Sequence, residues 1–155
     1  MSLSTRRLGP GDEAILNLLA AEEADFDLSG RGEPLEPLDP DTARRYLENP
    51  AVLHWVAADD DIVVGDLYCI LLPLSSGAGR ELLLYEIGVR TSWRRRGVGR
   101  ALIAEMEGWM RANRVAEVWV LADNPGAADF YRACGFSTDD SMALYMTREL
   151  DGPES

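Results

Sequence analysis

A chain of 155 residues suffices for one domain with a substantial core, and 46% hydrophobic and 27% charged residues exclude wholesale disorder. The net charge of −12 disfavours nucleic-acid binding, because affinity for phosphate backbones depends on Lys and Arg. An acidic surface attracts cations such as amine substrates, although solubility is the simpler explanation of the charge by itself. The apolar runs are too short to cross a membrane, and the N-terminus lacks the apolar core of a signal peptide, so we expect a cytoplasmic protein.

The first third of the chain combines short regular elements with an acidic segment. We expect a strand at 3–8, a helix from Asp12 to about Ala24, and a helix at 41–48 capped by Asp39 or Asp41. Residues 22–41 carry eight acidic residues against one arginine, and three prolines there argue against regular structure. This segment is either a functional lid or a solvated loop.

The rest of the chain predicts a mixed sheet. Strands are expected at 52–58, 62–72, 82–89 and 117–122, helices at 98–114 and from Pro125 to about Gly135, and last strands at Phe136 and 142–150. Three aspartates at 59–61 form the turn between the first two of these strands. The order is β-α-α-β-β-β-α-β-α-β-β, an α/β domain over residues 1–150 with helices on both sheet faces, followed by a polar tail at 151–155. Exposed strands near the C-terminus could pair two copies into a homodimer.

A glycine-bearing turn joins the apolar strand 82–89 to the amphipathic helix after Gly97. Several main-chain N–H groups converge at such a turn, and the positive end of the helix dipole favours a phosphate there. A P-loop is excluded because no lysine follows either glycine, and a Rossmann turn because Leu102 stands where the third glycine belongs. The alternative is a plain helix start with a solvated, arginine-rich face.

Two motifs then resemble the GCN5-related N-acetyltransferase (GNAT) family, which binds acetyl-CoA. The first is Arg94-x-x-Gly97-x-Gly99 after a strand, and the second is Asn124 followed by Phe-Tyr-Arg-Ala-Cys-Gly-Phe at 130–136. Both stand in the family's order, so the resemblance covers most of the chain. Residues 84–89 are most similar to the aminoglycoside 3-N-acetyltransferase branch. The resemblance implies a GNAT fold and acetyl transfer from acetyl-CoA to a primary amine of an aminoglycoside-like molecule, a polyamine or a peptide.

The resemblance also implies which residues hold coenzyme A. The pyrophosphate would lie on the loop, the pantetheine arm along the preceding strand as an added strand, and Asn124 would bind a pantetheine amide, cap a helix, or do both. The candidate coenzyme-binding residues are therefore Ile87, Gly88, Val89, Arg94, Arg95, Arg96, Gly97, Val98, Gly99, Arg100 and Asn124.

Catalysis is expected from Glu86 and Tyr131. Glu86 lies in an apolar run where the family often has a carboxylate, and burial would suit it to accept a proton from the amine; alternatively it pairs with an arginine at the sheet surface. Tyr131 matches the family tyrosine that hydrogen-bonds or protonates the departing sulfur; alternatively it is a half-buried helix tyrosine. Asp25, Asp27 and Asp123, together with Glu86, are the candidate acceptor-binding residues.

Covalent and metal chemistry find no support in the sequence. His54 is the only histidine and lies in an apolar strand, no Gly-x-Ser-x-Gly elbow is present, and Cys69 and Cys134 are more typical of small buried side chains. We therefore expect direct attack within a ternary complex and no metal. The alternative function is a non-catalytic acyl-CoA sensor or interaction module with the same fold.

Overall fold

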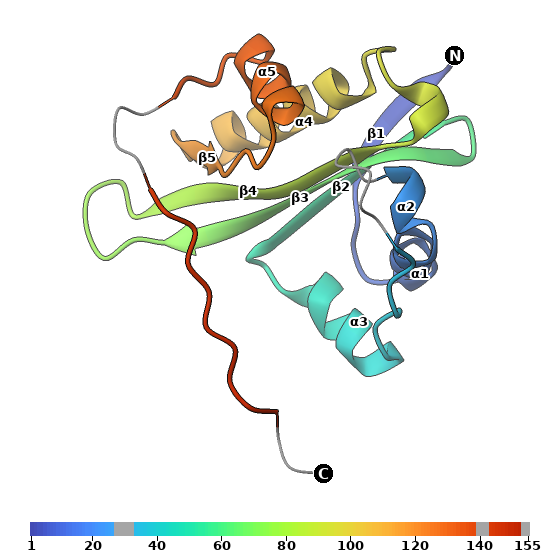
Figure 1. Cartoon of the computed structure of the whole chain (residues 1–155), viewed down its shortest axis with the longest axis horizontal. Helices are drawn as coiled ribbons and strands as arrows, with labels where there is room; N and C mark the ends of the chain where they lie inside the picture. Colours follow the sequence, from blue (N-terminus) through green and yellow to red (C-terminus); the bar gives the residue numbers. More distant parts are fainter. Residues whose placement is uncertain (27–32, 139–142, 153–155) are drawn as a thin grey trace.

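A single five-stranded sheet with helices on both faces forms the protein, as the computed structural model of residues 1–26, 33–138 and 143–152 shows (Figure 1). The strands stand in the order β1 (Leu3–Arg7), β2 (Val52–Asp59), β3 (Ile62–Pro73), β4 (Arg80–Val89), β5 (Val118–Val120). The helices are α1 (Glu13–Ala21), α2 (Glu23–Phe26), α3 (Pro40–Glu48), α4 (Val98–Asn113) and α5 (Pro125–Ala133). Neighbouring strands are antiparallel except for the parallel pair β4 and β5, so the predicted mixed α/β class is confirmed.

The two sheet faces follow from the alternation of side chains along each strand. On β2, Leu53 and Trp55 are buried in the larger core, which also contains Leu102 and Met106 of α4. Val56 belongs instead to the smaller core with α1, α2 and α3. Each fully buried side chain of this size stabilises the fold by about 2 kcal/mol, so the α4 face is the main source of stability.

A β-bulge interrupts β4 in the middle. Tyr68 of β3 pairs with Glu86, but the next residue, Cys69, pairs with Leu84, so Tyr85 has no partner of its own. Before the bulge Leu84 packs into the larger core, and after it Ile87 does. Glu86 therefore lies on the opposite face, toward α1, α2 and α3.

Beyond the bulge, β4 and β5 separate. Their pairing ends with Leu84 and Val120, although β4 continues to Val89. Over residues 85–89, the edge of β4 that faces β5 consequently has no strand partner in the described part of the chain. An open strand edge of this length can bind an extended ligand through main-chain hydrogen bonds.

Three sequence predictions need correction. The last strands are not formed over residues 136–138 and 143–150, where Leu144, Tyr145 and Met146 are more than four-fifths exposed; Met142 lies outside the described residues. Apolar residues make a strand only where they pair with the edge of another strand, and the described residues of this segment pair with none of the five strands. The first helix ends at Ala21, and α2 occupies part of the segment expected to be irregular.

Helix α3 follows the prediction, because Asp39 accepts a hydrogen bond from the N–H of Thr42 and so caps it. The turn after β2 is confirmed as well, with Asp60 at a φ of 52°. No helix among the described residues is both long and apolar enough to span a bilayer.

Candidate active site

The loop between β4 and α4 has the geometry of an anion site. Arg95 and Gly97 adopt left-handed backbone conformations, with φ values of 61° and 85°, and α4 begins at Val98. The N–H of Ala101 donates to the carbonyl of Gly97 at 3.0 Å, so the three preceding helical N–H groups have no acceptor within the helix. A Cβ on Gly97 would have no atom within 4 Å, and the approach to the loop is therefore open.

Gly99 allows two helices to pack closely. A Cβ at this position would lie 2.9 Å from Cζ of Phe130 on α5. The missing side chain thus allows α5 to pack on the first turn of α4. Gly97, with its positive φ and open surroundings, is the glycine whose conformation shapes the loop.

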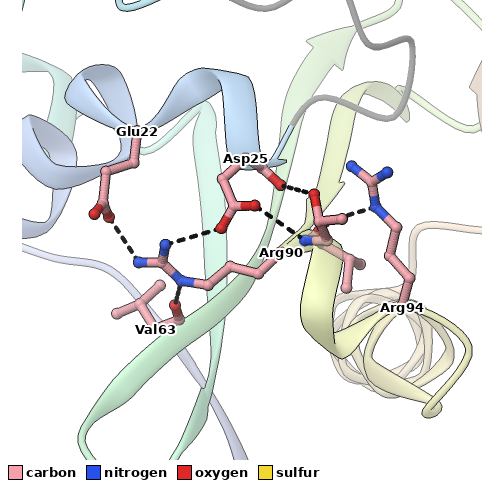
Figure 2. Close-up of polar contacts among 7 residues, drawn as sticks. Glu22, Asp25, Val63, Arg90 and Arg94 are labelled. Carbon is pink, nitrogen blue, oxygen red and sulfur yellow. Dashed lines mark hydrogen bonds and ion pairs between the residues drawn. The ribbon is translucent and has the colours of Figure 1, made fainter.

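The loop arginines divide into two groups. The Nε of Arg94 donates to the carbonyl of Val89 at 3.1 Å and braces the turn (Figure 2). Arg95, Arg96 and Arg100 are exposed, and Arg100 donates to the carbonyl of Ala133 at 3.3 Å. The exposed guanidinium groups supply positive charge around the start of α4, where an anion is favoured.

Arg90, which the sequence analysis did not single out, connects α2 to the end of β4 (Figure 2). Its guanidinium binds Glu22 at 2.7 Å, Asp25 at 3.2 Å and the carbonyl of Val63 at 2.6 Å, and it lies 4.6 Å from the ring centre of Phe26. The three oxygen atoms accept from N–H groups of this largely buried cation, and the aromatic ring lies against its face. The position of Arg90 directly after an apolar strand was the available sequence signal for this role. Three further arginines at 94–96 made it difficult to distinguish.

Asp25 has a different place from the one expected. Hydrogen bonds from Thr91 and then from Arg90 hold the pKa of Asp25 below its usual range. This carboxylate joins α2 to the turn after β4 and is not among the residues that line the acidic cavity described next. Asp27, the other acceptor candidate in this segment, lies outside the described residues.

A small acidic cavity lies beside the bulge of β4. It encloses about 70 Å³ and is lined by Glu23, Phe26, Asp66, Glu86, Ile87 and Gly88. Glu86 is exposed, so the burial expected for this carboxylate is wrong. The three carboxylates among the described lining residues favour a cation, and the volume suits a group of the size of an ammonium.

Tyr131 lies on the other side of the sheet. It is buried in the core on the α4 side, and this burial, followed by the charge of Asp123, raises the pKa of Tyr131 to about 12. Asn124 caps α5 by accepting from the N–H of Ala127 at 2.8 Å, and its amide donates to Asp123 at 3.1 Å. The helix-cap interpretation of Asn124 is confirmed. Glu86 and Tyr131 thus belong to opposite faces of the sheet.

The described residues contain no group of three or more His, Cys, Asp or Glu that could hold a metal ion. An open strand edge, a helix start rich in arginine and a small acidic cavity therefore meet around β4.

The model of the acetyltransferase (GNAT) family matches residues 15–136, which contain all of these features. The chain belongs to the GNAT family. It is 30% identical over 117 residues to the L-amino acid N-acetyltransferase AaaT of Escherichia coli K12, which covers 72% of this chain and 70% of the relative. The predicted membership and the enzyme class of N-acetyltransferase are confirmed.

Solved acetyltransferase structures have the same fold. An aminoglycoside acetyltransferase from an uncultured soil metagenomic sample, crystallised with trehalose, aligns with a TM-score of 0.80 at 23% identity over 95% of this chain and 97% of its own. A ribosomal-protein-alanine N-acetyltransferase from Brucella melitensis biovar Abortus 2308 aligns with a TM-score of 0.73 at 19% identity over 96% and 99%. At these identities the likeness establishes the fold, and acceptors differ between the two neighbours.

Proposed function

We propose that this GNAT enzyme transfers the acetyl group of acetyl-CoA to a primary amine of a small cationic molecule, by direct attack within a ternary complex. The observation that carries the proposal is the separation of β4 from β5 directly beside the acidic cavity. An extended thioester and a cationic amine could both reach the middle of β4 from there.

The coenzyme fits the loop and the open strand edge. Its pyrophosphate would lie on the main-chain N–H groups of residues 95–100, with Arg95 and Arg96 supplying charge. Its pantetheine arm would bind residues 87–89 as an added strand, with the amide of Asn124 near its other side. The open space at Gly97 supports this fit.

The acceptor must lose a proton before it attacks. An alkyl amine with a pKa near 10.4 is neutral in roughly four molecules out of ten thousand at pH 7. We assign the proton acceptor to Glu86, acting directly or through a water molecule. Its exposure lets it pass the proton to solvent after each turnover.

Tyr131 would stabilise the departing thiolate. Complete proton transfer from a phenol with a pKa of about 12 to a thiolate with a pKa near 8.5 is unfavourable by roughly 5 kcal/mol. A hydrogen bond from the hydroxyl to the sulfur has no such cost, so we assign donation without transfer. This choice narrows the two roles that the resemblance left open.

The test is turnover of acetyl-CoA with a panel of aminoglycosides, polyamines, peptide amines and L-amino acids, the last because of the relative from Escherichia coli. Release of the thiol and the mass of the product are measured together. We expect double-reciprocal plots of initial rate, with both substrates varied, to give intersecting lines. Parallel lines together with an isolable acetyl-enzyme would contradict direct attack. Thermal stabilisation by CoA without turnover of any amine would instead favour the sensor.

A further inference from the structure

A row of aromatic rings crosses the sheet face opposite α4 and ends at an exposed tyrosine. The ring of Tyr68 on β3 stacks on that of His54 on β2, with centres 5.4 Å apart and an angle of 27° between the planes. Tyr46 of α3 lies at the inner end of the row, 5.5 Å from Tyr68 between ring centres. At the outer end, the ring of Tyr85 on β4 lies 5.4 Å from that of Tyr68, and Tyr85 is 62% exposed. The row therefore leads from α3 to an accessible aromatic surface on β4.

The bulge of β4 places this aromatic surface beside Glu86. Consecutive residues of a regular strand point to opposite faces. Here Tyr85 contacts the ring of Tyr68, and Glu86 pairs with Tyr68, so both residues lie on one face. Burial first, and then the nearby phenol of Tyr85 and carboxylate of Glu86, raise the pKa of Tyr68, which agrees with this placement. An amine whose proton is accepted by Glu86 consequently has the ring of Tyr85 beside it.

The ring that supports Tyr85 is held in place. Tyr68 stacks on His54, whose imidazole has a partner at each nitrogen: the hydroxyl of Tyr46 lies 2.7 Å from Nδ1, and Oδ2 of Asp66 lies 2.8 Å from Nε2. Tyr85 thus rests on a fixed ring although most of its own surface is exposed. A flexible chain loses conformational freedom when it binds such a flat surface, whereas a ring has little to lose. The surface therefore favours a ring over an open chain of equal size.

Apolar side chains continue this surface along the same face. Ile70 stands two residues after Tyr68, and its partner across the strands is Leu83, two residues before Tyr85. Both are half-buried, and neither belongs to the two cores found among the described residues. Contiguous apolar surface that stays accessible is typical of a binding site. This surface begins beside Glu86, so its occupant is the part of the acceptor that is attached to the amine.

We propose that Tyr85, supported by Tyr68, binds a ring of the acceptor that carries the primary amine directly or on a short chain. The proposal rests on the proposed function and names the class of acceptor for that site. An aromatic ring contacts a tyrosine through its π face, and a sugar ring through its C–H groups, so the shared requirement is a ring face near the amine. Tyr85 is thus a specificity-determining residue, and ring-bearing amines should be better acceptors than open-chain amines such as spermidine.

Steady-state kinetics with three amines test this preference. 2-Phenylethylamine carries an aromatic ring, D-glucosamine carries a sugar ring, and ethylamine carries none. Tyr85→Ala should raise the KM for the ring-bearing acceptor about 5- to 20-fold, and leave the KM for ethylamine and for acetyl-CoA within about twofold. Tyr145→Ala, which removes a ring that is 84% exposed, is the matched control and should change none of these constants.

Three results would overturn the proposal. The first is an unchanged KM for the ring-bearing amines in a folded Tyr85→Ala enzyme. The second is an equal rise for ethylamine, which has no ring to lose a contact. The third is a wild-type enzyme whose kcat/KM for spermidine exceeds its kcat/KM for both ring-bearing amines.

Two further variants separate the flat ring from its hydroxyl and from apolarity alone. Tyr85→Phe keeps the ring and should keep the KM within about twofold of the wild type, whereas Tyr85→Leu stays apolar without a flat face and should resemble Tyr85→Ala. The CoA-induced rise in Tm shows whether each variant is folded. A purely structural role would lower Tm without this order of KM values. A Tyr85→Phe enzyme as impaired as Tyr85→Ala would assign the effect to the hydroxyl and contradict the proposal.

Nuclear magnetic resonance supplies a readout without turnover. The chain has five tyrosines, and the ring signal of ¹³C-labelled protein that disappears in Tyr85→Phe belongs to Tyr85. With CoA present, 2-phenylethylamine or D-glucosamine should give nuclear Overhauser effects to this ring, and ethylamine should give none. Contacts from one of the two probes identify the ring as aromatic or sugar. Contacts without turnover of any amine would support the ring site while the proposed function fails, and no contact from either probe would overturn the inference.

Discussion

The two halves of the proposed site are built in different ways. Apart from Asn124 and Tyr131, the coenzyme half lies within residues 87–100, a continuous stretch in which a strand end, a turn and a helix start follow one another. The acceptor half takes its side chains from α2, β3 and β4, and is supported from behind by α3 and β2. The first half depends on local backbone conformation, and the second on how distant segments pack.

This difference has a functional consequence. The shape of the loop follows from two left-handed residues and a helix start. Its binding of the coenzyme should therefore depend little on packing elsewhere in the sheet. A cavity lined from separate elements can change its preference when one side chain changes, without loss of the coenzyme site. Substitutions in one half should therefore affect the kinetics of one substrate and spare the other.

Glu86→Gln should produce the largest separation between the two halves. Loss of the general base should lower kcat/KM for the amine roughly 10²- to 10⁴-fold, while the KM for acetyl-CoA stays within about twofold. The defect should shrink between pH 7 and 9, because the neutral fraction of an alkyl amine rises about 100-fold over that range. Glu117→Gln, an exposed glutamate before β5, is the control and should retain full activity. Unchanged turnover in Glu86→Gln would remove this residue from the mechanism.

Tyr131→Phe should lower kcat roughly 10- to 100-fold through loss of a hydrogen bond to the thiolate. The raised pKa of Tyr131, about 12, means that the folded protein favours the protonated phenol, which stays a donor at every pH below about 11. The ratio of wild-type to variant rates should consequently be constant from pH 7 to 10. Tyr145→Phe, at a side chain 84% exposed, controls for the loss of a hydroxyl. A ratio that declines near pH 10 would contradict the buried phenol.

Local signals in the sequence predicted most of the fold and the coenzyme half. Except for α2, the order of elements up to α5 depends on neighbours within a few residues, as do the cap at Asp39 and the glycine-bearing start of α4. The final strands could not be predicted in the same way. Residues 143–146 are apolar, but a strand also needs pairing with another strand edge, and the composition of one segment does not reveal whether that pairing forms.

Two β-bulges prevented prediction of which side chains form the acceptor half. Counting back from the turn at 59–61 pairs His54 with Leu67, whereas an extra residue at Val64 shifts the register and pairs it with Tyr68. Since a shift of one residue exchanges the two faces of a strand, only the true register places Asp66 and Tyr68 on the face of His54. The bulge at Tyr85 then brings Glu86 to that face. Gly65 directly follows the first bulge and was an available signal for it, whereas no glycine or proline adjoins the bulge at Tyr85.

Substitutions of two glycines in and near α4 test the coenzyme half. They should change the free energy of unfolding in opposite directions. Gly97→Ala forces a side chain into a left-handed conformation and should lower the free energy of unfolding by about 1 kcal/mol, while raising the KM for acetyl-CoA several-fold. Gly108→Ala, in the open interior of the same helix, should raise the free energy of unfolding by about 0.5–1 kcal/mol and leave both KM values unchanged. Urea unfolding and steady-state kinetics measure the two effects. An altered KM for the amine in Gly97→Ala would show that the halves are coupled through the loop.

Arg90→Met should have the smallest effect on turnover, yet it tests the division most directly, because Arg90 joins the halves (Figure 2). Its carboxylate partners are more than two-fifths exposed, so solvent screening reduces the expected loss of unfolding free energy to about 1–2 kcal/mol. Both KM values should rise a few-fold together, since α2 lines the cavity and residue 90 directly precedes the turn into the loop.

The control for this variant is Arg111→Met, which removes an ion pair with Glu107 from a side chain 76% exposed and should cost less than about 0.5 kcal/mol. Destabilisation of Arg90→Met with both KM values unchanged would mean that the packing of Phe26 on Gly88 suffices to hold α2 against β4. A rise in only one of the two KM values would instead assign Arg90 to that half alone. The joint rise is thus the result that identifies this arginine as the connection between coenzyme and acceptor binding.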